Sequence, residues 1–249
     1  AKPLFFLVNP ETMHTGFWFF GHLLWKFTIT RQITHKRFHY SNPALEQTIA
    51  WIRFSNPVWL AAWFDKDVQL CHIISDVWFW FTEIGSLTAE AYAWNPAPRL
   101  YRLVKSQGLI VYYGLKNNWI DWAIKKYKSY KDIQIPVVIS LAKTNCQRTT
   151  DPVAWLEDYL TSLDKCIDAN VGDIIELNIS CPNAFGGENF AQPNNLKALL
   201  SAVKQRPVQK PLFIKMPVDC EREELKELID ICIHYTVTGI VISKKKKKR

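Results

Sequence analysis

The chain lacks three features that would assign it to other classes of protein. Its cysteines, at positions 71, 146, 166, 181, 220 and 232, show neither a zinc-binding spacing nor a compact disulfide framework. No run of 18 apolar residues occurs, so no transmembrane helix is predicted. No metal-binding constellation is visible, and we expect no metal. These absences favour a protein of the reducing cytoplasm.

A basic character is also missing from the body of the chain. The formal net charge is +8, but the last six residues, Lys244 to Arg249, are all positive, and leaving them out lowers it to +2. A lysine run of this kind is normally a solvated tail. The charge therefore gives no support to nucleic-acid binding, and we expect no nucleic-acid partner.

Glycine is scarce, with 9 residues, whereas tryptophan numbers 11. Average glycine usage is roughly 7%, so the shortage is real. The rest of the composition is ordinary for a globular protein, with 48% hydrophobic and 22% charged residues. A chain of 249 residues can bury a sizeable core, and one main domain is expected.

Strand-like and helix-like segments alternate after residue 55. Apolar, β-branched segments occur at 57–62, 79–84, 136–141, 173–178, 211–215 and 239–243. Helical patterns lie between most of them, such as Pro152 to Cys166 after the N-cap Asp151, and Glu221 to His234 after Asp219. This alternation predicts parallel strands with right-handed crossovers. Six strands are too few to close an eight-stranded barrel, so we expect an open sheet with unpaired edge strands.

The first 54 residues predict a helical extension, with helices near 11–27 and 43–54. Thr15 to Phe27 is rich in Phe, Trp and Leu and is too short to span a bilayer. The basic residues near this segment, which suit a helix lying in a bilayer interface, are Lys26, Arg31, Lys36 and Arg37. The alternative is a helix packed on its own domain. The predicted domains are thus the extension 1–54, a catalytic domain 55–243 and a basic tail 244–249.

The most informative motif is Asn178-Ile179-Ser180-Cys181-Pro182-Asn183, at the end of an apolar run from Gly172. In parallel α/β proteins the carboxyl ends of the strands face the ligand, so polar side chains clustered there indicate chemistry. The motif places a thiol between two amides, before the glycine pair Gly186-Gly187. The alternative is a turn whose Asn side chains bond the local backbone around a buried Cys.

This motif resembles the catalytic loop of dihydroorotate dehydrogenases. The resemblance continues in order along the chain, through Asn56–Asp67, Phe81–Thr88, Asn95–Leu103, Ile135–Asn145, Pro211–Pro217 and Gly239–Ser243. Residues 1–14 are similar to the opening of the membrane-associated, quinone-linked branch, which tips the choice toward peripheral contact with the cytoplasmic membrane. The resemblance implies an α/β fold of the (β/α)8 TIM-barrel type, truncated here after about six strands.

The resemblance also implies a function. It is the oxidation of dihydroorotate to orotate in de novo pyrimidine synthesis, with a hydride passing to flavin mononucleotide (FMN) and electrons passing on to a quinone. A Cys at 181 is typical of the soluble branch, so a soluble acceptor is the alternative. Two further alternatives are a degenerate remnant that no longer holds flavin, and a related flavin barrel that acts on another pyrimidine.

Roles for single residues follow from the same resemblance. Cys181 matches the catalytic base, and a thiol is a better base near neutral pH than an unassisted hydroxyl. Asn178 and Asn183 match the amides that bind the substrate, and Lys66 matches a lysine between flavin and substrate carboxylate. The residues that match flavin contacts are Ala61, Ala62, Lys66, Ser86, Ser140, Asn178, Lys215 and Ser243, and Lys143 matches a further family lysine. For Lys66 the alternative is a solvated loop lysine paired with Asp65 or Asp67.

Two departures from the family pattern bear on function. Val111 stands where the family usually has a substrate-binding Asn, so either Asn117 or Tyr112 replaces it or substrate binding is lost. Six residues fall where the resemblance expects Gly: Trp59, Trp63, Trp78, Trp80, Trp94 and Trp119. Trp63 is the sharpest conflict, because its backbone would pass close to the flavin.

Two hypotheses explain these tryptophans. Either the protein is a relative that lost its cofactor, or UGA codons that the source reads as Gly were translated as Trp. Replacement by one residue type favours the second hypothesis. Recoding does not explain Val68, Val138 and Ala142, which also resemble replaced glycines.

Overall fold

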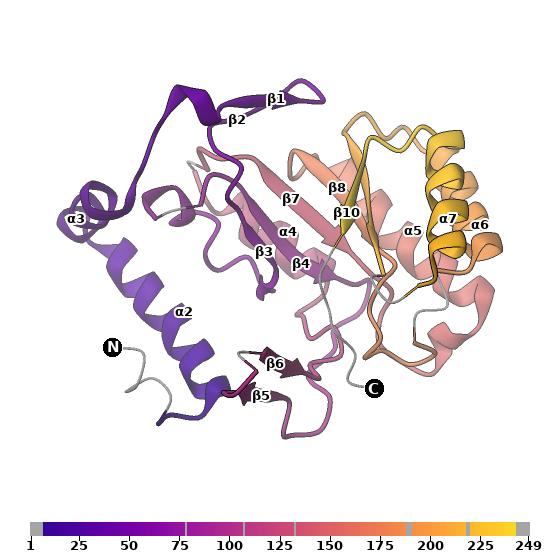
Figure 1. Ribbon diagram of the computed structural model, residues 1–249, viewed down its shortest axis with the longest axis horizontal. Coiled ribbons are helices and arrows are strands. Elements are labelled where there is room, and N and C mark those ends of the chain that lie inside the picture. Colours follow the sequence, from indigo (N-terminus) through magenta and orange to yellow (C-terminus); the bar gives the residue numbers. More distant parts are fainter. Residues whose placement is uncertain are drawn as a thin grey trace.

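The centre of the molecule is a parallel sheet of six strands in the order β10-β9-β8-β7-β4-β3 (Figure 1). The computed structural model describes residues 7–77, 79–106, 108–131, 133–187, 191–217 and 220–242. The strands are β3 (Leu60–Asp65), β4 (Thr82–Leu87), β7 (Val137–Leu141), β8 (Ile174–Asn178), β9 (Leu212–Met216) and β10 (Gly239–Ile242). Each strand joins the sheet beside the one that precedes it in the chain, as in a (β/α) barrel. Within the described residues the sheet is open between β3 and β10.

Four of the six predicted strands begin and end within one residue of the observed ones. The first two, expected at 57–62 and 79–84, lie three residues further along the chain. Both strands begin later than the apolar runs and continue into polar residues, Asp65 in β3 and Ser86 in β4. Hydrophobicity alone therefore places these two strands too early.

Four helices connect these strands and cover one face of the sheet (Figure 1). They are α4 (Ile120–Lys128), α5 (Pro152–Ala169), α6 (Pro193–Lys204) and α7 (Arg222–His234). Asp151 caps α5 as predicted, because its side chain accepts hydrogen bonds from the backbone N–H groups of Val153 and Ala154. Glu221 caps α7 in a capping box with Glu224, and Asp219 lies outside the described residues.

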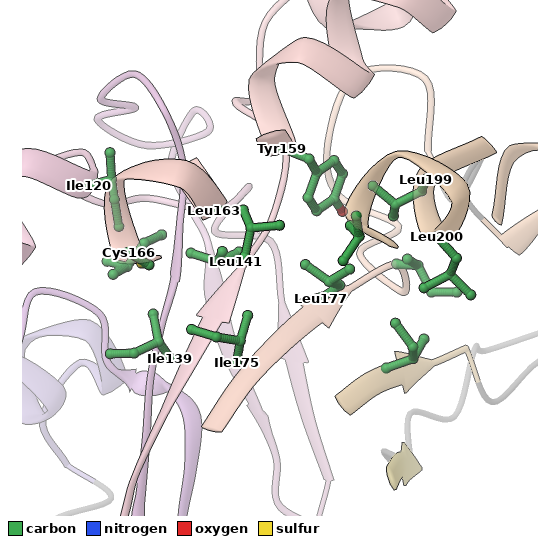
Figure 2. Close-up of a cluster of buried hydrophobic side chains, with 14 of the residues drawn as sticks. Ile120, Ile139, Leu141, Tyr159, Leu163, Cys166, Ile175, Leu177, Leu199 and Leu200 are labelled. Atoms are coloured by element: carbon green, nitrogen blue, oxygen red, sulfur yellow. The ribbon is translucent and has the colours of Figure 1, made fainter. Parts of the chain in front are cut away.

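The main core lies between this helical layer and the sheet (Figure 2). Figure 2 shows Ile139 and Leu141 of β7 and Ile175 and Leu177 of β8 facing Tyr159, Leu163 and Cys166 of α5 and Leu199 and Leu200 of α6. Full burial of each such Leu or Ile stabilises the fold by about 1.5–3 kcal/mol. Successive strand residues point to opposite faces, so the residues between these point away from the helices.

The other face of the sheet is apolar near the amino-terminal ends of its strands. Val138 and Ile174 form a small core with Phe54, and Phe213 packs against it. Phe54 belongs to a hairpin of β1 (Gln47–Ile49) and β2 (Ile52–Phe54), preceded by the 3-10 helix η1 (Pro43–Leu45). The helix predicted near 43–54 is therefore wrong. The hairpin forms because Phe54 is buried against the sheet.

Two helices precede the hairpin: α2 (Pro10–Lys26), as predicted, and α3 (Thr28–Phe38). No helix in the described ranges is long and apolar enough to cross a membrane. A second hairpin, β5 (Leu100–Leu103) and β6 (Gly108–Val111), lies beside the amino-terminal end of α2 (Figure 1). Arg99 and Glu11 join the two elements in an ion pair of 2.8 Å.

Candidate active site

A hydrogen-bonded polar network occupies the face of the sheet that points away from the helices. The Ser140 hydroxyl on β7 donates to Glu176 Oε1 on β8 at 2.7 Å. The Lys215 amine on β9 donates to Glu83 Oε1 on β4 at 2.5 Å and lies 3.6 Å from Glu176 Oε1. All four side chains are buried. Four neighbouring strands thus contribute to one charged cluster.

Asn178, at the end of β8, extends this network toward the predicted substrate site. Its Nδ2 donates to the Ser86 hydroxyl at 2.7 Å, and the Ser86 and Ser140 hydroxyls lie 2.9 Å apart. Three predicted site residues, Ser86, Ser140 and Asn178, are therefore joined by hydrogen bonds, and a fourth, Lys215, joins them through its ion pair with Glu176.

The sequence reasoning missed Glu83 and Glu176. The signal was present, because each is a single carboxylate inside an apolar strand, where an unpaired charge is costly. That argument singled out Lys215 and applies equally to its two partners. Burial and then the Glu83 charge raise the pKa of Glu176 to about 8, against the effect of Lys215. Burial opposes ionisation of Glu83, but the Lys215 ammonium holds the pKa of Glu83 below its usual value. At neutral pH the cluster therefore holds one cation, one anion and one protonated carboxyl.

Cys181 begins the loop after β8 and is half-buried. The loop is held from three sides. Asn183 Nδ2 donates to the Val111 carbonyl at 2.9 Å, and Asn95 Nδ2 donates to the Asn183 carbonyl at 3.1 Å. Asn145 Oδ1 accepts from the Phe185 N–H at 2.7 Å. The loop that carries the thiol is therefore fixed by side-chain amides.

Lys143 is a cation that interacts electrostatically with the Cys181 thiol. Its amine donates to the Thr149 carbonyl at 2.9 Å and to the Phe185 carbonyl in the same loop. Burial lowers the pKa of Lys143, and negative charge on Cys146, Asp158 or Cys181 acts in the opposite direction. A lysine that interacts electrostatically with Cys181 favours its thiolate form.

Lys66 is the most unusual charged group in the site. Its side chain is 2% exposed, and its amine has no hydrogen-bond partner among the described residues. Aromatic rings surround the Lys66 amine instead: Tyr113 at 4.2 Å, Trp94 at 5.6 Å, Trp18 at 5.8 Å and Trp63 at 5.9 Å. Burial and then repulsion by Lys116 lower the pKa of Lys66 to about 7.

The alternative for Lys66, a pair with a neighbouring aspartate, is wrong. Asp65 accepts backbone hydrogen bonds from Gln69 at 2.6 Å and Leu70 at 2.8 Å. Asp67 forms its ion pair with Lys116. Both carboxylates are therefore committed elsewhere, which leaves the amine of Lys66 available to an anion.

Helix α2 forms one wall of the space around Lys66. Trp18 Nε1 donates to the Phe64 carbonyl at 2.9 Å, and the His14 ring lies 4.9 Å from the Phe64 ring. Burial and then the Lys66 charge lower the pKa of His14 to about 4, so this imidazole is neutral. Helix α2 is thus packed directly on the end of β3.

The remaining predicted residues divide into three groups. Ala62 is buried in β3, whereas Ala61 is exposed on the opposite side of the strand. Ser243 lies outside the described residues. Asn117 does not replace the Asn expected at Val111, because its Oδ1 accepts from the N–H groups of Thr88 and Trp119 and its Nδ2 donates to Thr88 and Leu115. Its amide therefore holds the backbone before α4.

Comparison with known proteins agrees with this geometry. A family model described as dihydroorotate dehydrogenase matches residues 44–249. The chain belongs to the dihydroorotate dehydrogenase family.

Several relatives of this family member are named dihydroorotate dehydrogenase (quinone). The chain is 32% identical to the protein of Trichormus variabilis, over 85% of this chain and 55% of that protein. It is 31% identical to that of Mycolicibacterium vanbaalenii, over 96% and 66% of the two chains, and 28% identical to that of Helicobacter acinonychis, over 96% and 67%. The chain thus spans between about half and two thirds of the length of these relatives. Their names confirm the predicted resemblance to the quinone-linked branch.

Solved structures confirm the predicted fold class. DHODH from Eimeria tenella, ligand-free, superposes with a TM-score of 0.75 at 21% identity, over 85% of this chain and 64% of that chain. The complex of that enzyme with ferulenol gives 0.77 at 20% identity, over 97% and 68%. The six-stranded sheet is thus part of a (β/α)8-type barrel.

The family implies a flavin. The polar side chains of the site suit a flavin, but the indoles of Trp63 and Trp94 reduce the room beside Lys66. The unpartnered amine of Lys66 suits an anionic group, and the Ser86–Ser140–Asn178 network offers donors and acceptors along the strand ends. The rings of Trp63 and Trp94, however, stand within 6 Å of that amine, at two positions where the family pattern has Gly. Two indoles therefore lie close to the lysine that the family resemblance places beside the flavin.

Proposed function

We propose that this chain forms the substrate-facing part of a dihydroorotate dehydrogenase, which oxidises dihydroorotate to orotate in pyrimidine synthesis. FMN would accept the hydride, and a quinone would accept the electrons in turn. Family membership and the names of the relatives support the reaction. The observation that carries the proposal is the buried, unpartnered amine of Lys66, at the same carboxyl-terminal edge of the parallel sheet as Asn178 and the Cys181 loop.

Each residue has a distinct task in this proposal. The ammonium of Lys66 binds the carboxylate of dihydroorotate, a compact charge that orients an anion. The side-chain amide of Asn178 donates one N–H to Ser86, and that of Asn183 donates one N–H to the Val111 carbonyl. Each amide has a second N–H that can donate to the ring of the substrate. Cys181 removes the proton from carbon 5, and Lys143 supports its thiolate.

Replacement of Cys181 by Ala tests this assignment in the full-length, flavin-loaded protein. The measurement is the rate of flavin bleaching after anaerobic mixing with dihydroorotate. A general base contributes typically 10²–10⁴-fold, so we expect a loss of at least about 100-fold. Cys146→Ala is the matched control, because this thiol is also half-buried and also interacts with Lys143. Equal bleaching rates in Cys181→Ala and the wild type would exclude Cys181 as the base.

Peripheral contact with a membrane through α2 and α3 is the second part of the proposal. The inner side of α2 is packed on the domain, where Gly21 faces Leu70 and Ile73. The outer side of the two helices exposes an apolar set: Phe17, Phe19, Phe20, Leu23, Leu24, Phe27, Ile29 and Ile33. An apolar surface with basic residues nearby suits a bilayer interface. A quinone could then reach the site from the membrane along α2.

Co-sedimentation with anionic phospholipid vesicles tests this contact. Phe19→Glu places a charge in the exposed apolar set and should abolish sedimentation with the vesicles. Gln32→Glu is the control, since it adds the same charge at an exposed polar position of α3. If Phe19→Glu sediments as completely as Gln32→Glu, the apolar set does not bind the membrane.

A further inference from the structure

Three tryptophans hold a backbone conformation that side chains of this size rarely adopt. The φ angle is 59° at Trp51, 68° at Trp63 and 69° at Trp119. For a bulky residue a positive φ is an outlier, whereas glycine populates this region freely. Eight non-glycine residues of the described ranges have a positive φ, and three of them are Trp, although Trp makes up 11 of the 249 residues. Tryptophan is therefore over-represented among these residues, although Val68, which also resembles a replaced glycine, shares the conformation with φ 54° and is not explained by recoding.

Trp119 is the strongest of the three cases. It precedes α4 with φ 69° and ψ 165°, a combination that is essentially confined to glycine. It caps the helix with no side-chain hydrogen bond. Nothing in the local structure therefore requires an indole, and the backbone requires a residue without a Cβ.

Trp51 occupies the second position of a two-residue hairpin turn. The turn joins β1 and β2 between the paired residues Ile49 and Ile52, and both turn residues, Ala50 and Trp51, have positive φ. This is the geometry of a type I′ turn, in which glycine is the preferred second residue. Trp51 was not among the six tryptophans that the family pattern marks, so the backbone identifies it independently.

Trp63 lies within β3, where the register with β4 shifts between Leu60 and Asp65. A strand residue with left-handed φ at such an irregularity occupies a position that favours glycine. The indole of Trp63 then points among the rings around Lys66.

Other tryptophans of the chain show the opposite behaviour. Trp155 lies inside α5, is 3% exposed and packs in the main core beside Tyr159. Trp18 lies inside α2 and donates its indole N–H to Phe64. By contrast, the side chains of Trp51, Trp63 and Trp119 are all exposed, at 74%, 40% and 41%. Some tryptophans of the chain therefore contribute to packing or hydrogen bonding, whereas three others stand where the backbone conformation disfavours a bulky side chain.

We infer that the natural protein carries glycine at positions 51, 63 and 119, and that the source organism reads UGA codons at these positions as glycine. Trp59, Trp80 and Trp94 are not among the residues with positive φ, so the backbone conformation at these positions does not call for glycine. For Trp63 the inference also deepens the proposed function and rests on it, because glycine there removes one of the indoles that crowd the amine of Lys66. For Trp51 and Trp119 it rests on the backbone alone.

Peptide mass spectrometry of the protein purified from its source organism, read beside the codons of its gene, tests the inference. We expect UGA codons and glycine at 51, 63 and 119, and UGG codons and tryptophan at 18 and 155. Tryptophan at the three positions in the native protein would overturn the inference. Glycine there in a native protein that binds no flavin would uphold it and would refute the proposed function instead.

A recombinant variant gives a second, independent measurement. Trp51→Gly changes an exposed turn that contributes no residue to the proposed site, so its effect reports the backbone. We expect a higher melting temperature than that of the recombinant parent. A lower melting temperature would show that the hairpin tolerates the tryptophan and would remove the physical basis of the inference.

Discussion

Replacement of Glu176 by Gln should remove a pH dependence of stability that the wild type shows. The pKa of Glu176 is raised from 4.5 to about 8 in the folded chain, so between these values the folded state binds a proton that the unfolded state has released. Stability therefore falls as the pH rises through this window. A full proton difference is worth about 1.4 kcal/mol per pH unit, so the fall between pH 5 and pH 7.5 is about 3 kcal/mol.

The groups that face Glu176 do not reverse this sign. The pKa of Glu83, on β4, is lowered, so its contribution is already complete above its unfolded value and stays constant across the window. Lys215, on β9, has a raised pKa and keeps its charge throughout. Tyr159, on α5, has a pKa raised by burial and stays neutral. Glu176 is thus the member of this cluster whose proton count differs between the folded and unfolded states from pH 5 to pH 7.5.

The assay is urea unfolding of the wild type and Glu176→Gln at a series of pH values. Gln keeps an acceptor for the Ser140 hydroxyl and resembles the protonated acid in shape and charge. The two proteins should have similar stability near pH 5, and the variant should be the more stable by about 3 kcal/mol near pH 7.5. Other titrating groups are common to both proteins and cancel in the difference. Parallel curves for the two proteins would show that Glu176 is ionised in the folded chain and would refute the reasoning.

Two further predictions concern the site and the core. Lys66→Met should raise the free energy of unfolding at pH 6 by about 1–3 kcal/mol, because it removes a buried amine that lacks a hydrogen-bond partner in the described structure. The gain should shrink as the pH rises above about 7, where the folded chain releases the proton of Lys66, and a constant gain from pH 6 to pH 9 would contradict the lowered pKa. Leu163→Ala should cost about 2–5 kcal/mol in urea unfolding, since Leu163 is fully buried between α5 and the sheet, and a cost below about 1 kcal/mol would mean that this layer is loosely packed.

The sequence was sufficient to predict the strand ends that carry the site, because parallel strands deliver their polar ends to one edge of a sheet. Asn178 and Lys215 were found in this way, Ser86 was found through the family resemblance, and the three do lie in one network. What the sequence could not provide is the face on which an inner polar residue lies. Glu83 and Glu176 became visible as partners of Lys215 only when the register of four strands was known.

The error at 43–54 has a similar origin. Thr48, Ile49 and Ile52 fit an amphipathic helix as well as a hairpin over so short a span. Phe54 is buried against Val138 and Ile174, which are far away in the chain, and this burial stabilises the hairpin over a helix. The positive φ of Trp51 could not be predicted either, because tryptophan is a residue that argues against a type I′ turn.

The charge of Lys215 is compensated by neighbouring carboxyl groups, whereas the amine of Lys66 has no such partner among the described residues. This difference bears on the kind of ligand that the site accepts. Lys215 has two carboxylates within 3.6 Å, so its charge is compensated inside the protein before any ligand arrives. Lys66 has aromatic rings and no hydrogen-bonded partner among the described residues, and burial already disfavours its charged form. An anion that binds beside Lys66 restores the partner that the amine lost on folding, so binding should raise the pKa of Lys66 and take up a proton near pH 7. A neutral ring would offer this amine a hydrogen-bond acceptor but no opposite charge, so under the proposed function a ring that carries a carboxylate would gain more from Lys66.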